Sequence, residues 1–417
     1  MSEETVPEAQ APDASAPRRR RRFGLLPRIL VAIVLGVLLG LVVPEWLARV
    51  FTTFNGLFSA FLGFLVPLII VGLITPAIGE LGRGAGRWLA ATTGIAYLST
   101  LLAGFIALAV CWFLLPVLLA GRSVGPLADP EEGALAPYFT LEIPPVFGVM
   151  TALVLAFCVG IGLTLTPTGP LHGVSAQFRE IVVRAIEAII VPLLPVYIFG
   201  MFLGLTMNGR IREVLATFAT VIAVVLALSV LVLLLQYLIA GLVAGRNPFR
   251  MLWNMLPATA TALGTSSSAA TIPVTLDCVR RNGVPGAIGA FVVPLCATTH
   301  LAGSTLKITS FAIAVMLVTG MPMNPLLIAG FVCMLGVTMI AAPGVPGGAI
   351  VAAAGVLSSM LGFDEAAVGL MIAGYIAIDS FGTAANVTGD GAIAAVVARM
   401  ARGRPQPPVP DAPSALV

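Results

Sequence analysis

Long apolar segments follow one another along almost the whole chain and limit what it can fold into. About 20 consecutive apolar residues are enough for a helix to cross the roughly 30 Å hydrocarbon core of a bilayer. Windows of this kind recur between residues 24 and 400, and only 10% of all residues are charged. Soluble domains carry about 25% charged residues. We therefore predict an all-α integral membrane protein.

The charges that flank these segments predict their orientation. The segments lie at about 24–49, 54–76, 88–120, 143–166, 178–207, 212–244, 247–283, 285–320, 324–361 and 364–400. Arginine and lysine favour the cytoplasmic ends of membrane helices. The run Arg18 to Arg22 therefore predicts a cytoplasmic N-terminus, within a basic lead at residues 1–23 whose composition is that of a disordered segment.

Later charges predict that the seventh and ninth segments each enter and leave the membrane on one face. Arg280 and Arg281 reach the cytoplasm only if the seventh segment is a re-entrant hairpin. Asp364 and Glu365 lie outside only if the ninth segment is its counterpart from the opposite face. The pattern fits eight spans, two hairpins and a disordered cytoplasmic tail at 401–417, as expected of a multi-pass plasma-membrane protein.

Each predicted hairpin is interrupted at its middle by small residues and proline. The first interruption is TSSSAATIPVT, from Thr265 to Thr275, and the second is AAPGVPGGAI, from Ala341 to Ile350. Paired broken segments in two halves of a chain are typical of a transporter's binding site. Close helix packing, which also favours Ser, Gly and Ala, is the alternative explanation.

The last segment carries a stripe of polar residues. Asp379, Thr383, Asn386 and Asp390 are spaced 4, 3 and 4 apart, which places them on one helical face. Ionisable groups inside a membrane are costly and usually functional, and oxygen ligands of this kind suit a hard cation such as sodium. The alternative is a polar stripe that is hydrated or paired with a basic residue.

A second set of polar residues lies in segment 285–320. His300, Ser304 and Lys307 are spaced 4 and 3 apart. Histidine changes charge near neutral pH, so His300 is either a proton- or cation-coupling residue or a neutral packing residue. Lys307 either forms a structural ion pair with an aspartate of the stripe or takes part in the mechanism.

Several classes of protein are not indicated by the sequence. The five cysteines include no CxxC pair, so neither a disulfide framework nor a zinc site is expected. The nucleotide-binding, metalloprotease and hydrolase motifs are absent. We expect no enzyme activity, no cofactor and no nucleic-acid partner. If the chain is a transporter, an ion gradient must supply the work.

Four motifs together resemble the glutamate transporter family, the dicarboxylate/amino acid:cation symporters. They are TSSSAATIPVT, PLCATTHLAGST, PGVPGGA and D-x3-T-x2-N-V-x-G-D, and the resemblance extends over nearly the whole chain. It implies a glutamate-transporter-like fold, an elevator mechanism and a homotrimer. The implied parts are a scaffold domain (about 24–76 and 143–207), a transport domain (about 88–120 and 212–400), hairpin HP1 (about 247–283) and hairpin HP2 (about 324–361).

The resemblance also implies roles for individual residues. Asp379 would bind a substrate amine, Ser304 would contact substrate, and Asn386 would bind either the substrate or sodium. The other implied substrate contacts are Ser266, Ser267, Ser268, Val345, Pro346, Gly347, Gly382 and Thr383. The implied sodium ligands are Asn386, Asp390 and Thr298.

Two departures from the family pattern change what is expected of the substrate and the ion. Gly382 stands where members that carry acidic amino acids have an arginine, so a second substrate carboxylate would be uncompensated. The family's Asn-Met-Asp-Gly-Thr is His300-Leu301-Ala302-Gly303-Ser304 here, which removes two sodium-binding side chains. A proton at His300, or the fixed ammonium of Lys307, would then replace one sodium.

The sequence thus predicts a secondary active transporter, a symporter that carries a neutral amino acid and is coupled to sodium or protons. Two alternatives stay open at this point. One is a cation-independent exchanger or facilitator with the same fold, and the other is a membrane sensor with a degenerate site.

Overall fold

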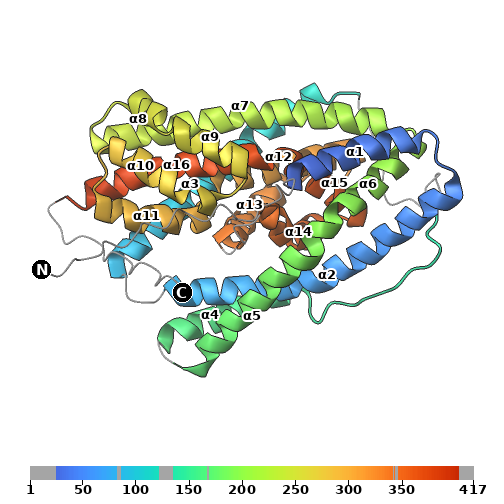
Figure 1. Ribbon diagram of the computed structural model, residues 1–417, viewed down its shortest axis with the longest axis horizontal. Coiled ribbons are helices and arrows are strands. Elements are labelled where there is room, and N and C mark those ends of the chain that lie inside the picture. Colours follow the sequence, from blue (N-terminus) through green and yellow to red (C-terminus); the bar gives the residue numbers. More distant parts are fainter. Residues whose placement is uncertain are drawn as a thin grey trace, which may run out of the picture.

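In the computed structural model, the described residues are 25–81, 86–121, 135–166, 169–340, 342 and 346–402 (Figure 1). Every regular element among them is a helix, which confirms the predicted all-α class. The first helices are α1 (Leu25–Gly40), α2 (Glu45–Leu81), α3 (Gly86–Leu118), α4 (Val149–Leu165), α5 (Pro170–Ala185), η1 (Ile186–Ile190), α6 (Val191–Met207), α7 (Ile211–Ala244) and α8 (Pro248–Asn254). The others are α9 (Leu256–Thr265), α10 (Ser268–Arg281), α11 (Gly286–Thr299), α12 (Ala302–Thr319), α13 (Pro325–Ile340), α14 (Gly348–Leu361), α15 (Glu365–Ala377) and α16 (Asp379–Met400).

Several helices are long and apolar enough to cross a membrane. Within the described part of the chain there are five such stretches: Glu45–Gly79, Trp88–Leu118, Pro170–Met207, Ile211–Ala244 and Gly286–Thr319. The pair α15 and α16, bent by 62°, gives a sixth if it is counted as one span. These helices confirm a multi-pass membrane protein, while the eight-span topology with two re-entrant hairpins stays a prediction.

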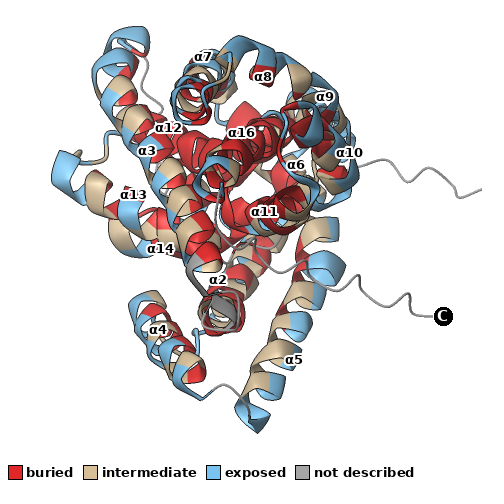
Figure 2. Ribbon diagram, turned by 90° about the vertical axis from the view of Figure 1, so that its left-hand side faces the viewer, coloured by how far each residue is buried: buried red, intermediate tan, exposed pale blue. Residues whose placement is uncertain are grey.

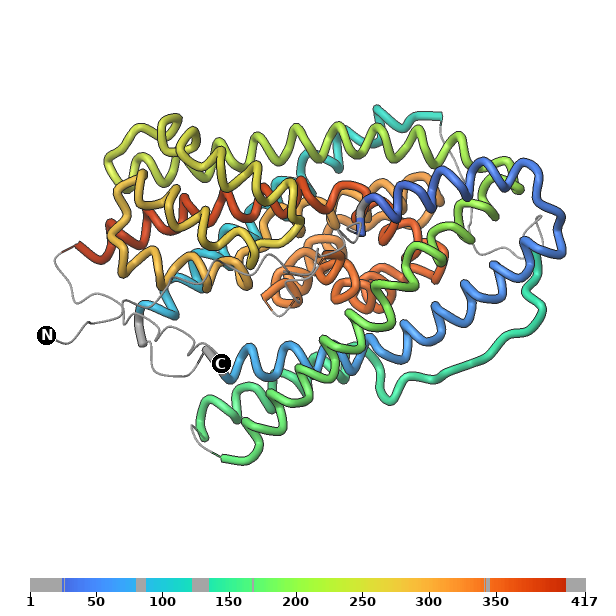
Figure 3. The backbone as a smooth tube through the Cα atoms, in the orientation of Figure 1, coloured from blue at the N-terminus to red at the C-terminus, as the bar shows by residue number. Residues whose placement is uncertain are grey.

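The helices pack into two groups. In the first, α2 contacts α4, α5 and α6, and α1 lies along α6. In the second, α16 packs against α7, α9, α10, α11 and α12, and α3 lies along α12. The backbone trace in Figure 3 shows the same arrangement, with α1, α2 and α6 running beside the second group. Helices α14 and α15 contact the first group: α14 packs against α2 and α4, and α15 packs against α1 and α6.

Burial differs between these groups. Figure 2 shows buried residues concentrated on α11, α12 and α16, whereas α4 and α5 are mostly intermediate or exposed. On α16 the buried residues include all four members of the polar stripe. The polar face of this helix is therefore directed into protein rather than toward its surroundings.

The serine run forms the turn between α9 and α10, which pack against each other. Ser266 ends α9 in the left-handed region, with φ 50°. The Ser267 hydroxyl then accepts the N–H of Ala270 at 3.2 Å and caps α10, as short polar side chains commonly do at helix starts. This capping bond accounts for one of the three serines, Ser267.

Two breaks were not predicted. Segment 285–320 divides into α11 and α12 at His300 and Leu301, and segment 364–400 divides into α15 and α16 at Ile378. Each break leaves helix ends without intrahelical partners for some backbone groups. Both breaks lie beside the polar residues described next.

Candidate functional site

Two hairpin turns and two helix breaks surround a small cavity. Its lining residues are Ser266, Ser268, Ala297, Thr298, Leu301, Ser304, Ala342, Ala349, Tyr375, Asp379, Thr383 and Asn386. The volume within which the centre of a water-sized molecule can lie is ≈ 30 Å³. One water needs about 10–15 Å³ on this measure, so the cavity holds about two waters and is too small for an amino acid.

A second cavity shares two of these residues. It measures ≈ 250 Å³ and lies between the start of α1, the end of α9 and the turn before α14. Ser266 and Asp379 line both cavities, and Pro346 lines only the larger one. Asp379 therefore stands between the small cavity and a larger space beside it.

Most of the residues predicted to contact substrate line one of the two cavities. Four of the predicted residues do not, or do so only through their backbone. Ser267 caps α10 and does not line either cavity. Gly347 reaches the site through its backbone, while Val345 lies outside the described residues. Gly382 faces a lysine on a neighbouring helix rather than the cavities.

Asp379 connects three elements. It is the first residue of α16, where a carboxylate is favoured by the helix dipole. Its Oδ1 lies 3.2 Å from Nζ of Lys307 on α12. Its Oδ2 accepts the backbone N–H of Gly347, at the turn before α14, at 2.9 Å. One carboxylate thus links α12, α16 and the second hairpin turn.

Lys307 is the only lysine of the chain, and its side chain is 0% exposed. Its Nζ lies 3.6 Å from the ring centroid of Tyr375, a cation–π contact. Lys307 does not line either cavity. The ammonium therefore contacts Asp379 without lining either cavity, and the pairing left open by the sequence is with Asp379 rather than Asp390.

Gly382 provides the space that this lysine occupies. A Cβ at this position would overlap Cε and Nζ of Lys307. This close fit depends on how α12 and α16 pack against each other, which the sequence alone does not record. A lone lysine in a chain of arginines was the available signal.

Asn386 and Ser304 form a hydrogen-bonded group at the start of α12. Asn386 Oδ1 accepts the N–H of Gly303 at 2.8 Å, and its Nδ2 donates to Ser304 Oγ at 3.2 Å. The Tyr375 hydroxyl also donates to Ser304 Oγ, at 3.0 Å. With two bonds accepted, the Ser304 hydroxyl keeps its own proton to donate, and it faces the small cavity.

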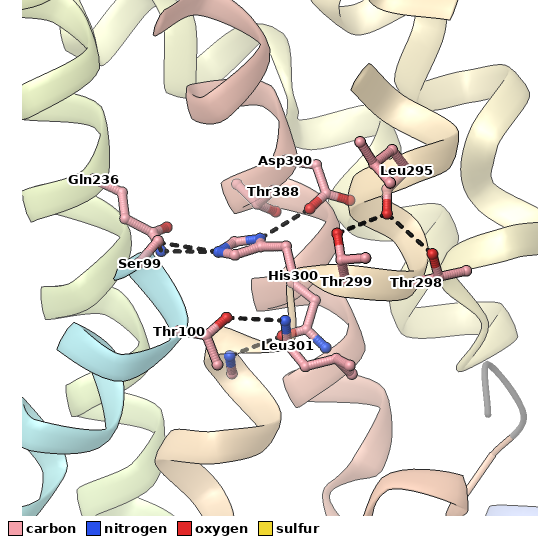
Figure 4. A network of polar contacts seen from close by, with 12 residues as sticks. Ser99, Thr100, Gln236, Leu295, Thr298, Thr299, His300, Leu301, Thr388 and Asp390 are labelled. Atoms are coloured by element: carbon pink, nitrogen blue, oxygen red, sulfur yellow. Dashed lines mark hydrogen bonds and ion pairs between the residues drawn. The ribbon is translucent and has the colours of Figure 1, made fainter. Parts of the chain in front are cut away.

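Asp390 belongs to a separate buried cluster. His300 Nδ1 lies 2.9 Å from Asp390 Oδ1, with side chains 0% and 2% exposed. His300 Nε2 lies 3.1 Å from Ser99 Oγ, which also accepts a bond from Gln236. Figure 4 shows the imidazole between Asp390 on one side and Ser99 and Gln236 on the other. None of these four residues lines either cavity.

The predicted sodium ligands have other partners in this structure. Asp390 pairs with His300, and Asn386 bonds to Gly303. The Thr298 hydroxyl donates to the Leu295 carbonyl at 3.0 Å but still lines the small cavity. In the described ranges, no cluster of three or more His, Cys, Asp or Glu side chains is arranged to hold a metal ion. Asp390 and Asn386 are thus engaged by protein groups, whereas Thr298 faces the small cavity.

Comparison with known proteins gives one consistent result. Residues 25–400 match the model of a family described as the sodium:dicarboxylate symporter family. A serine/threonine transporter SstT of Acinetobacter baumannii (strain ATCC 17978) is 27% identical over 387 residues, covering 88% of this chain and 95% of that protein. An excitatory amino acid transporter of Caenorhabditis elegans is 28% identical over 295 residues, covering 68% of this chain and 57% of that protein.

Proposed function

Because the chain belongs to the sodium:dicarboxylate symporter family, we propose that it carries a neutral amino acid across the plasma membrane, coupled to a proton or sodium gradient. The family and the relatives are transporters rather than enzymes. The observation that carries the proposal is Asp379, a carboxylate that lines two neighbouring cavities between two helical turns. This is the arrangement expected where broken helices surround a transported solute.

The charges around the cavity favour a substrate with no net charge. Asp379 is balanced by Lys307, and the other polar lining groups of the small cavity are hydroxyls and an amide. Lys307 is buried and does not line the cavity, so it offers the cavity no cationic surface. A second substrate carboxylate would be buried without a partner, which is costly. A zwitterion instead places its amine at Asp379 and its carboxylate at Ser304 and the hydroxyls of Ser266 and Ser268.

Loading the site requires movement. The small cavity is too small for an amino acid, and the Gly347 N–H occupies one oxygen of Asp379. Substrate would therefore enter through the larger neighbouring cavity as the turn before α14 moves away. In the elevator mechanism that we propose, the group containing α16 moves against the group containing α2, within a homotrimer.

For the coupled ion, the His300–Asp390 pair favours a proton. The imidazole pairs with the Asp390 carboxylate, and a histidine side chain is a group that can take up a proton. The alternative of a cation-independent exchanger is favoured by one specific observation. Both aspartates of α16 already have cationic or titratable partners within the protein, Lys307 and His300.

Ligand binding to purified protein tests the role of Asp379. We expect Asp379→Asn to weaken binding of labelled serine or alanine about 10- to 150-fold, since hydrogen bonds to charged groups contribute about 1.5–3 kcal/mol. Asp277→Asn is the matched control, because Asp277 is exposed, pairs with Arg280 and lines neither cavity. Undiminished binding in Asp379→Asn would contradict the amine role and favour a sensor whose ligand is held elsewhere.

A further inference from the structure

A third cavity lies away from the site, where α7 and α16 end and α11 begins. Its lining residues are Ala244, Arg246, Asn282, Gly283, Val284, Pro285, Ala395, Ala398, Arg399 and Arg402. It measures ≈ 170 Å³ for the centres of water-sized molecules, which leaves room for a group much larger than one water. Three arginines from two distant parts of the chain meet there, and none of the lining residues is acidic.

Arg246 is fixed in place by the turn between α10 and α11. Its Nη1 donates to the Asn282 carbonyl, and its Nη2 donates to the Gly283 carbonyl at 3.2 Å. Gly283 has φ 69°, a left-handed conformation that suits glycine. Asn282 is itself held by a bond from its Nδ2 to the Met251 carbonyl at 3.1 Å. The guanidinium is thus held in the cavity lining by two backbone carbonyls and is not a freely moving surface group.

Arg399 and Arg402 complete the cationic lining. Both are exposed, and no ion pair joins either to an acidic side chain within the described residues. The last turn of α16 directs carbonyl oxygens toward this end, and Arg399 offsets their partial negative charge. On the other wall, α11 begins after Pro285 with no side-chain cap, so its first N–H groups lack intrahelical partners.

We propose that this cavity binds a phosphate group, from either an anionic phospholipid headgroup or free phosphate. Guanidinium groups match the planar, bidentate geometry of phosphate oxygens. Basic pockets between membrane helices are the kind of site that holds lipid phosphates. Helices α8 and α10, which carry Arg250, Arg280 and Arg281, lie at the same end of the bundle (Figure 1), but none of the three lines the cavity. The site is therefore distinct from the general excess of arginine expected at one membrane face.

Native mass spectrometry of the full-length protein in detergent tests this site with phosphatidylglycerol, phosphatidylcholine and inorganic phosphate as probes. Arg399→Gln/Arg402→Gln should weaken phosphatidylglycerol binding about 25-fold, since each basic residue near an anionic headgroup contributes about fivefold. Arg250→Gln/Arg281→Gln removes the same charge outside the cavity and should leave binding within about twofold of the unmodified protein.

The probes distinguish the two sources of phosphate. Selective phosphatidylglycerol binding without inorganic phosphate binding assigns the site to a lipid headgroup. Inorganic phosphate binding that is lost with Arg399 and Arg402 assigns it to free phosphate. Equal losses in both double variants, or no loss in Arg399→Gln/Arg402→Gln, would overturn the proposal. Serine or alanine binding by the same samples reports separately on the transport site.

Discussion

Lys307→Met is expected to lower the free energy of unfolding by about 3–5 kcal/mol, because it leaves the Asp379 carboxylate buried without its cation. Methionine follows the unbranched path of the lysine stem, so the loss is chiefly electrostatic rather than one of packing. The change would be measured by chemical unfolding of the purified protein in detergent. Arg281→Met, at an exposed position, should change the same quantity by less than about 0.5 kcal/mol.

The double variant Lys307→Met/Asp379→Asn separates charge from packing. Removing both charges leaves no unpaired ion, and replacing a buried ion pair with uncharged groups is often nearly neutral. We therefore expect the double variant to be more stable than Lys307→Met alone. If its loss of stability equals the sum of the two single losses, Lys307 and Asp379 are not energetically coupled.

His300→Gln is expected to reduce amino acid accumulation driven by a proton gradient at least about 100-fold, the scale at which positioned proton-transfer groups act. Glutamine can still donate a hydrogen bond to Asp390, but it cannot take up a proton. Exchange of labelled for unlabelled amino acid at equal pH on both sides should persist, since that process needs no net proton movement. The measurement is uptake into proteoliposomes with and without a pH difference.

His172→Gln is the matched control for this prediction. His172 is the other histidine of the chain, partly exposed and hydrogen-bonded to the Thr166 carbonyl. Its replacement should leave proton-driven accumulation unchanged. Proton-driven uptake that survives in His300→Gln would remove His300 from the coupling mechanism. Loss of exchange as well as accumulation would indicate a structural role for the His300–Asp390 pair.

Features set by local chemistry could be predicted from the sequence. The apolar windows gave the class, and the serine run marked a turn because hydroxyls cap helices more readily than they continue them. The polar stripe placed Asp379, Thr383 and Asn386 on one face, and all three line the small cavity. Ser267 shows the limit of this reasoning, since its hydroxyl caps α10 rather than facing the cavity.

Contacts between helices could not be predicted in the same way. The fit of Lys307 against Gly382 depends on how α12 and α16 are aligned, and no periodicity within one helix records that alignment. Ser99 and Gln236 were missed for the same reason, since they lie on α3 and α7 and meet His300 only in the folded protein. An isolated glutamine in the apolar run LVLLLQYLIAG was the one local signal for Gln236.

Uptake of labelled serine, alanine and aspartate into proteoliposomes tests the proposed function most directly. Each would be offered under an inward proton gradient without sodium, and then under an inward sodium gradient at equal pH. We predict that the proton gradient drives accumulation of serine or alanine, while aspartate is excluded under both conditions. Uptake of aspartate at a comparable rate, or no uptake of any of the three under either gradient, would contradict it.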